Sequence, residues 1–74
     1  MPKLPVISGK DFVKVLEKLG FRVERQNGSH IVLRRANDAL TVSVPNHAEL
    51  SMGVLNTLMK SVGLSRGELL KLLR

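Results

Sequence analysis

The chain has 74 residues and no cysteine, and its 12 Lys and Arg residues against 6 Asp and Glu residues give a net charge of +6. This length predicts one domain, residues 1–74, which buries only about 60 % of the surface that the unfolded chain exposes. The lack of cysteine excludes a disulfide framework and a thiolate zinc site, and it fits a reducing, cytoplasmic compartment. Neither a membrane span nor export is expected, because no apolar run reaches roughly 18 residues and no signal-peptide pattern opens the chain.

The positive charge predicts a polyanionic partner: nucleic acid first, an anionic membrane second and an acidic protein third. The alternative is a basic protein that is merely soluble. The only aromatic residues are Phe12 and Phe21, both at positions patterned as buried. Proteins that bind single strands by base stacking need exposed rings, so the composition argues against an RNA-recognition-motif or OB-type module.

The N-terminal part predicts an extended segment and then an amphipathic helix. Residues 1–7 contain two prolines and are expected to be extended, with apolar side chains available for packing. Ser8 and Asp11 have the spacing of a capping box. An apolar stripe follows at helical spacing, formed by Phe12, Val15, Leu16 and Leu19. Gly20 is placed to end the helix in a left-handed conformation.

Three short strands and two further helices are predicted after that. Apolar and polar residues alternate over residues 21–26, 29–34 and 40–44, as in a meander of antiparallel strands. Ser51 caps a second helix that Gly63 closes, and Ser65 begins a short leucine-rich helix. Those leucines pack on the core or form a patch for a partner, and packing is the favoured interpretation. The fold class is therefore α+β, in the order α-β-β-β-α(-α), with the helices on one face of a three-stranded antiparallel sheet.

The loop between the first two strands decides which side chains share a face. Asn27-Gly28 reads most simply as a two-residue turn, but this register puts Glu24 opposite Ile31. A three-residue loop, residues 26–28, with a bulge at Gly28 instead pairs Val23 with Ile31 and Phe21 with Leu33. We choose the bulged loop because the buried face fixes the register of a strand.

This choice places His30 on the open face of the sheet. Its expected companions there are Arg22, Glu24, Val32, Arg34, Thr41 and Ser43. Glu24 would be the cross-strand neighbour of His30, close enough to orient the ring. A Ser29–His30–Asp38 triad is not expected, because neighbouring residues in a strand point to opposite faces. A metal site on His30 and His47 lacks supporting carboxylates, so the sequence predicts neither a metal nor a cofactor.

His30 is either a solvated strand residue or the acid–base group of a phosphodiester-cleaving site. Metal-free RNA cleavage needs a base for the ribose 2′-hydroxyl, cations for the phosphorane and an acid for the leaving oxygen. Histidine suits this chemistry because both of its protonation states exist near neutral pH. His47 is interpreted as a loop residue. The predicted RNA contacts are Lys10, Lys14, Arg22, Arg25, Ser29, Arg34 and Arg35.

The order of several short motifs resembles that of HicA-type toxins. These motifs are Leu4-Pro5-Val6 with Ser8-Gly9-Lys10, Leu16-Glu17-Lys18-Leu19-Gly20-Phe21, Arg25-Gln26 before Gly28-Ser29-His30, Thr41-Val42, Pro45 before His47, Glu49-Leu50 ahead of Gly53 and Leu55, and Val62-Gly63-Leu64-Ser65. The resemblance covers nearly the whole chain. It implies a fold similar to that of a double-stranded RNA-binding domain.

The resemblance also implies a function. HicA-type toxins are ribonucleases that cut mRNA without metal and without the ribosome, and a HicB antitoxin binds and blocks them. The family's catalytic histidine falls on His30. One departure is at Ser51-Met52-Gly53-Val54, where the family often has Lys or Arg before the glycine and Thr after it. A phosphate bound there would rest on backbone N–H groups.

The sequence therefore predicts a toxin endoribonuclease with His30 as general acid and base. Two other functions fit the same features. One is a non-catalytic module that binds double-stranded RNA by its shape and phosphates. The other is a protein-interaction module whose basic face meets an acidic partner.

Overall fold

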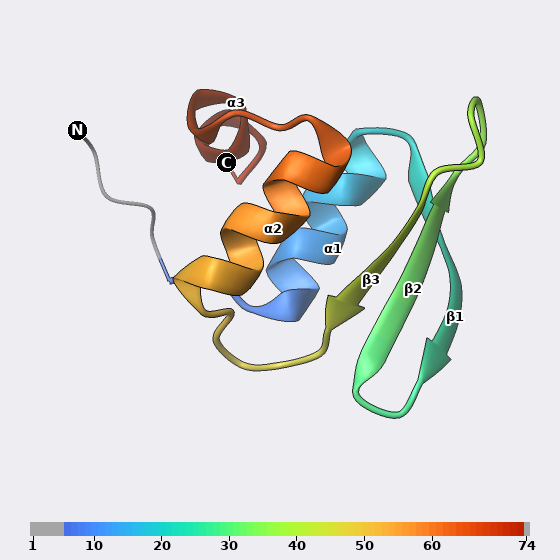
Figure 1. The fold of residues 1–74 in the computed structure, drawn as a ribbon, viewed down its shortest axis with the longest axis horizontal. Helices are drawn as coiled ribbons and strands as arrows, with labels where there is room; N and C mark the ends of the chain where they lie inside the picture. Colours follow the sequence, from blue (N-terminus) through green and yellow to red (C-terminus); the bar gives the residue numbers. More distant parts are fainter. Residues whose placement is uncertain (1–5, 74) are drawn as a thin grey trace.

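The chain folds into an open three-stranded sheet with helices on one of its faces (Figure 1). The computed structural model describes residues 6–73. Its elements are α1 (Gly9–Lys18), β1 (Phe21–Asn27), β2 (His30–Arg35), β3 (Thr41–Pro45), α2 (Met52–Val62) and α3 (Arg66–Leu72). The strands are antiparallel in the order β1-β2-β3. The predicted α+β fold is confirmed, while most of the expected extended segment 1–7 lies outside the described residues.

The helix ends are where the capping residues predict them. Ser8 and Ser65 both form complete capping boxes, in which the serine oxygen accepts a backbone N–H three residues later. At α2 the Ser51 side chain accepts the N–H of Val54, and Gly63 ends the helix in the left-handed conformation, with φ of 69°. Such caps satisfy backbone groups that a helix end leaves unpaired. Among the described helices, none has the length and apolar character needed to cross a membrane.

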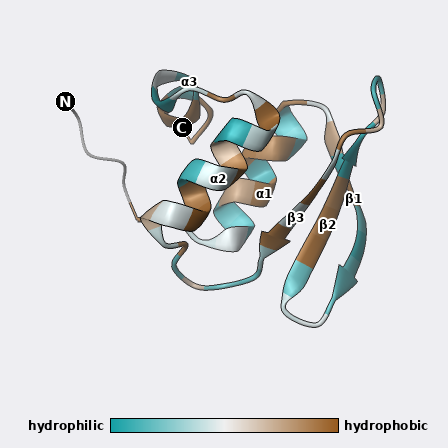
Figure 2. Cartoon of the chain, in the orientation of Figure 1, coloured by the Kyte–Doolittle hydropathy of each residue, from teal (hydrophilic) through white to brown (hydrophobic). Residues whose placement is uncertain are grey.

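The hydrophobic core lies between the helices and the inner face of β2 and β3. The fully buried side chains there come from the first helix, the sheet and the C-terminal helices, and include Phe12, Leu16, Phe21, Leu33, Val44, Leu55 and Leu69. In Figure 2, β2 and β3 are largely hydrophobic and β1 is largely hydrophilic. Phe21 is the only buried residue of β1. The strand β1 is thus an exposed edge of the sheet.

The short helix α3 packs on the core, as the leucine pattern predicts. Leu69 is fully buried, and Leu72 and Leu73 pack against the core while partly exposed. The Lys18 ammonium donates a hydrogen bond of 2.7 Å to the carbonyl oxygen of Leu72. A cation at this position also interacts favourably with the C-terminal end of a helix.

The predicted register of the first hairpin is wrong, although the predicted faces are right for residues 21–23. The loop has two residues, Gly28 and Ser29, and Gly28 has the positive φ, 58°, that a tight hairpin turn requires. The pairs are Val23 with Leu33 and Phe21 with Arg35, and the bulge lies at Glu24 rather than in the loop. Without this bulge the two-residue loop would put Glu24 opposite Leu33 on the buried face. Over residues 21–23 the observed register differs from the predicted one by two residues, so these side chains keep their predicted faces. Beyond the bulge the difference is three residues, so Arg25 moves to the open face and Gln26 to the inner face.

The N-terminus of α1 approaches the end of β3 at backbone distance. The N–H of Gly9 donates to the carbonyl oxygen of His47 at 2.9 Å. A Cβ atom at Gly9 would overlap the carbonyl oxygen of Pro45. This position therefore needs glycine for the close approach of two backbone segments.

We expect Gly9→Ala to destabilise the fold by about 1–3 kcal/mol, because the added methyl group must push α1 and β3 apart. The matched control is Gly53→Ala in α2, where nothing lies within 4 Å of an added Cβ. That variant is expected to be stabilised by about 0.5–1 kcal/mol through better helix propensity. Urea unfolding of both variants measures the difference, and a change of the same sign in both would contradict the packing argument.

Candidate active site on the open face of the sheet

The face of the sheet that turns away from the helices, which we call the open face, has three cross-strand rows of residues. From the strand register the rows are Arg22–Arg34–Thr41, Arg25–Val32–Ser43 and Asn27–His30–Pro45. His30 lies at one end of this face, and the row with two arginines lies at the other. Four residues separate His30 from Arg34 along β2, which corresponds to about 13 Å. The predicted place of His30 on the open face is confirmed.

Backbone contacts on both sides hold His30 in place. It pairs with Asn27 of β1 and with Pro45 of β3. The N–H of Asn46 donates to the carbonyl oxygen of Ser29 at 2.6 Å, which ties the loop after β3 to the hairpin turn. The His30 side chain itself is exposed. A substrate on the open face can therefore reach the ring without a change in the fold.

Glu24 is not the cross-strand neighbour of His30, contrary to the prediction. Asn27 occupies that position, because the turn consists of Gly28 and Ser29 and leaves Asn27 in β1. Glu24 instead lies at the bulge, and its Oε2 is 3.7 Å from a guanidinium nitrogen of Arg34. The hypothesis that Glu24 orients the His30 ring is therefore wrong.

Ser29 does contact His30, also contrary to the prediction. The Ser29 Oγ lies 3.4 Å from Nδ1 of His30. The two can meet because Ser29 belongs to the turn and not to the strand, so the alternation of strand side chains does not apply to it. The remaining member of the imagined triad, Asp38, lies in the turn at the other end of β2 and binds Arg35. The pair therefore leaves Nε2, on the other side of the ring, for a substrate.

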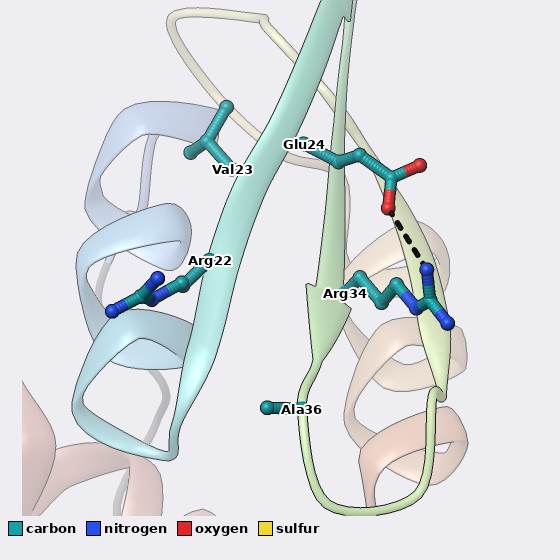
Figure 3. Close-up of a pocket in the computed structure, with 5 residues that line it drawn as sticks. All are labelled: Arg22, Val23, Glu24, Arg34 and Ala36. Carbon is teal, nitrogen blue, oxygen red and sulfur yellow. Dashed lines mark ion pairs between the residues drawn. The ribbon is translucent and has the colours of Figure 1, made fainter.

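The cations of the open face lie in the two rows beyond His30. Arg25 is one position from the row of His30 along the face, as the diagonal neighbour of the histidine across β1 and β2. Diagonal neighbours are about 7–8 Å apart, which is within reach of a long side chain. The bulge at Glu24 is what turns Arg25 outward. Arg22 and Arg34 flank a hollow of about 370 Å³ that is lined by Arg22, Val23, Glu24, Arg34 and Ala36 (Figure 3).

Arg35, predicted as an RNA contact, has structural partners. Its guanidinium donates two hydrogen bonds to the carboxylate of Asp38, at 3.0 and 2.6 Å. The same group lies 5.1 Å from the centre of the Phe21 ring. Asp38 also accepts the N–H of Leu40 at 3.2 Å. These contacts close the turn between β2 and β3, in which Ala39 is left-handed with φ of 60°.

The hydrogen bonds from Arg35 lower the pKa of Asp38 to about 2, and the N–H of Leu40 adds to this effect. In return, the hydrogen bond to Asp38 raises the pKa of Arg35. A carboxylate held in this way favours the folded state only while it is ionised. The stabilisation that this turn gives to the folded state is thus lost in the acid range, when Asp38 is protonated.

The two lysines predicted to touch RNA are not on the open face. Lys10 and Lys14 are exposed on α1, whose buried residues face the sheet. Lys14 lines a second hollow, of about 270 Å³, together with Lys18 and residues of α3. These lysines thus belong to the helix layer and not to the open face with His30. Their contact with RNA stays a prediction.

His47 lies in the loop between β3 and α2, where its carbonyl oxygen holds Gly9. Within residues 6–73, no three His, Cys, Asp or Glu side chains lie close enough together to hold a metal ion.

The Ser51-Met52-Gly53-Val54 segment begins α2, and the Ser51 side chain already accepts the N–H of Val54 at 3.2 Å. Met52 and Val54 are exposed apolar residues there, 51 % and 37 % accessible.

These features define a small basic α+β domain that presents one exposed histidine and several arginines on an uncovered sheet. A family model described as the HicA toxin of bacterial toxin–antitoxin systems matches residues 9–64. The chain belongs to the HicA toxin family, because this match covers more than half of it. The family gives the protein the role of a toxin with an antitoxin as its partner. A search of curated proteins found no match.

Two contacts were not expected from the sequence: Asn27 is the neighbour of His30, and Glu24 is the partner of Arg34. A signal for the bulge was present. Phe21 and Val23 alternate with polar residues, but the next apolar position of that alternation is occupied by Arg25. Such a break of phase within a strand indicates an extra residue.

The carboxyl group of Asp38 is expected to titrate near pH 2, and Arg35→Gln should return its pKa most of the way to about 3.9. The folded-state pKa lies below the unfolded one, so the contribution of Asp38 to stability is complete above the unfolded pKa and is lost as pH falls through about 2. Proton-detected carboxyl titration measures the first effect. Urea unfolding of wild type and Asp38→Asn measures the second, and a stability difference that stays constant down to pH 2 would contradict it.

Proposed function

We propose that this protein is a metal-independent endoribonuclease that cleaves mRNA on the open face of its sheet, with His30 as general acid and base. Membership of the HicA toxin family supports the proposal. The observation that carries it is the exposed His30 ring at the end of the open face. Its Nδ1 lies beside the Ser29 hydroxyl, and Nε2 is on the opposite side of the ring. The proposed setting is the cytoplasm, and the proposed partner is a HicB-type antitoxin that covers this face.

The reaction begins with the ribose 2′-hydroxyl next to the scissile phosphate. Nε2 of neutral His30 takes the hydroxyl proton while the 2′-oxygen forms a bond to phosphorus. The bond from phosphorus to the 5′-oxygen then breaks, and this oxygen receives a proton, from the histidinium or from a second acid. The products are a 2′,3′-cyclic phosphate and a 5′-hydroxyl. General acid–base catalysis of this kind contributes about 10²–10⁴-fold to a rate.

Arg25 is the open-face cation best placed to stabilise the phosphorane. It is the diagonal neighbour of His30, whereas Arg22 and Arg34 lie one row further away. A guanidinium binds two phosphate oxygens at once, and this interaction strengthens as negative charge develops. Ser29 contributes by its hydroxyl contact to Nδ1, which favours one ring orientation.

We expect His30→Ala to lower RNA cleavage by about 10²–10⁴-fold in the presence of EDTA. The matched control is His47→Ala, which removes the other histidine of the chain. His47 lies in a loop and binds Gly9 through its backbone carbonyl oxygen, which the substitution keeps. This variant should cleave as the wild type does. Degradation of a labelled mRNA fragment by the three purified proteins measures the difference.

Three results would contradict the proposal or one of its parts. Equal cleavage by wild type and His30→Ala would indicate a contaminating nuclease or a different catalytic group. Tight, salt-sensitive binding to duplex RNA without any cleavage would instead favour a non-catalytic double-stranded RNA-binding module. Loss of cleavage in EDTA, restored by a divalent ion, would overturn metal independence.

A further inference from the structure

Two arginines lie directly opposite each other at the end of the open face that is far from His30. Arg22 of β1 pairs with Arg34 of β2. Like charges at directly opposite positions destabilise a sheet. Figure 3 shows their side chains extending away from each other. Both arginines line the hollow of about 370 Å³. The arrangement costs stability and leaves a space that suits an anion.

Glu24 neutralises only one of the two arginines. Its carboxylate lies 3.7 Å from Arg34, and the side chains of Arg34 and Glu24 are 56 % and 46 % exposed. An ion pair this open to water is weak and easily exchanged. Within residues 6–73, no carboxylate pairs with Arg22. The bulge thus supplies a counter-ion that a stronger anion can displace.

We propose that this hollow binds a phosphate of the RNA strand distant from the bond that is cut, and that Glu24 competes with that phosphate for Arg34. The inference rests on the proposed function, since it takes RNA as the ligand. Arg34, once released from Glu24, donates to the phosphate oxygens, and Arg22 adds positive charge on the other side of the hollow. Val23, which is 46 % exposed, and Ala36 offer apolar surface to the adjoining ribose.

The position of the hollow sets the path of the RNA strand across the open face. Arg34 and His30 lie on the same face of the same strand, about 13 Å apart, with Arg25 in the row between them. A single RNA strand that follows β2 therefore contacts the arginine pair, then Arg25, then His30. The arginine pair anchors the strand at a phosphate that does not react, and Glu24 reduces the affinity of that anchor.

The test is binding of a labelled single-stranded 2′-O-methyl oligoribonucleotide, which has no free 2′-hydroxyl and is not cleaved. Glu24→Gln should tighten binding by about two- to fivefold, because it frees Arg34 from an exposed ion pair. Glu17→Gln is the matched control, since it removes the same charge from an exposed residue of α1, on the other side of the sheet. This control should change affinity clearly less. Arg22→Gln and Arg34→Gln should each weaken binding and reduce the salt dependence by about one phosphate contact.

Equal effects of Glu24→Gln and Glu17→Gln would overturn the inference, because net charge alone would then explain them. Unchanged binding in Arg22→Gln and Arg34→Gln would overturn it as well. Cleavage of unmodified RNA by wild type and His30→Ala is measured in parallel and decides the proposed function separately. If cleavage depends on His30 but Glu24→Gln has no specific effect on binding, the inference about the hollow fails and the proposed function stands. The reverse result leaves an RNA-binding site on a protein that does not cut.

Discussion

The close approach of Gly9 to the end of β3 is the contact on which the candidate site depends. The N–H of Gly9 binds the carbonyl oxygen of His47, and there is no room for a side chain between α1 and Pro45. Pro45 in turn pairs with His30, and Asn46 binds the turn residue Ser29. The helix thus fixes one end of β3, and β3 fixes the histidine at the tip of the hairpin. Catalytic groups need this kind of support, because small displacements of a reacting group reduce rates strongly.

The charge of the protein is divided between two surfaces. Lys10 and Lys14 lie on the outer side of α1, whereas Arg22, Arg25 and Arg34 share a sheet face with His30. The net charge of +6 attracts any polyanion to the whole molecule. On the open face these arginines lie in two rows beyond His30. Arg35 is outside these rows, and Asp38 and Phe21 already engage its guanidinium.

The helices and the faces of β2 and β3 were predictable from the sequence, and the pairing of β1 was not. Serine caps at Ser8, Ser51 and Ser65 act through contacts within a few residues, which a sequence shows directly. The register of β1 depends instead on where one extra residue is inserted, and a bulge in the loop or at Glu24 sends Phe21 to the core in both cases. The errors about Glu24 and Ser29 as neighbours of His30 both follow from this ambiguity. The break of alternation at Arg25 was the local signal that distinguishes the two.

The central claim is that the open face cuts RNA by attack of the 2′-hydroxyl, and the ends of the products test it most directly. RNA is incubated in EDTA with the wild-type protein, and the termini of the fragments are identified by mass spectrometry. The account predicts fragments that end in a 2′,3′-cyclic phosphate and begin with a 5′-hydroxyl, and that are absent when His30→Ala is used. Fragments with 3′-hydroxyl and 5′-phosphate ends would contradict it, because water rather than the ribose would then be the nucleophile.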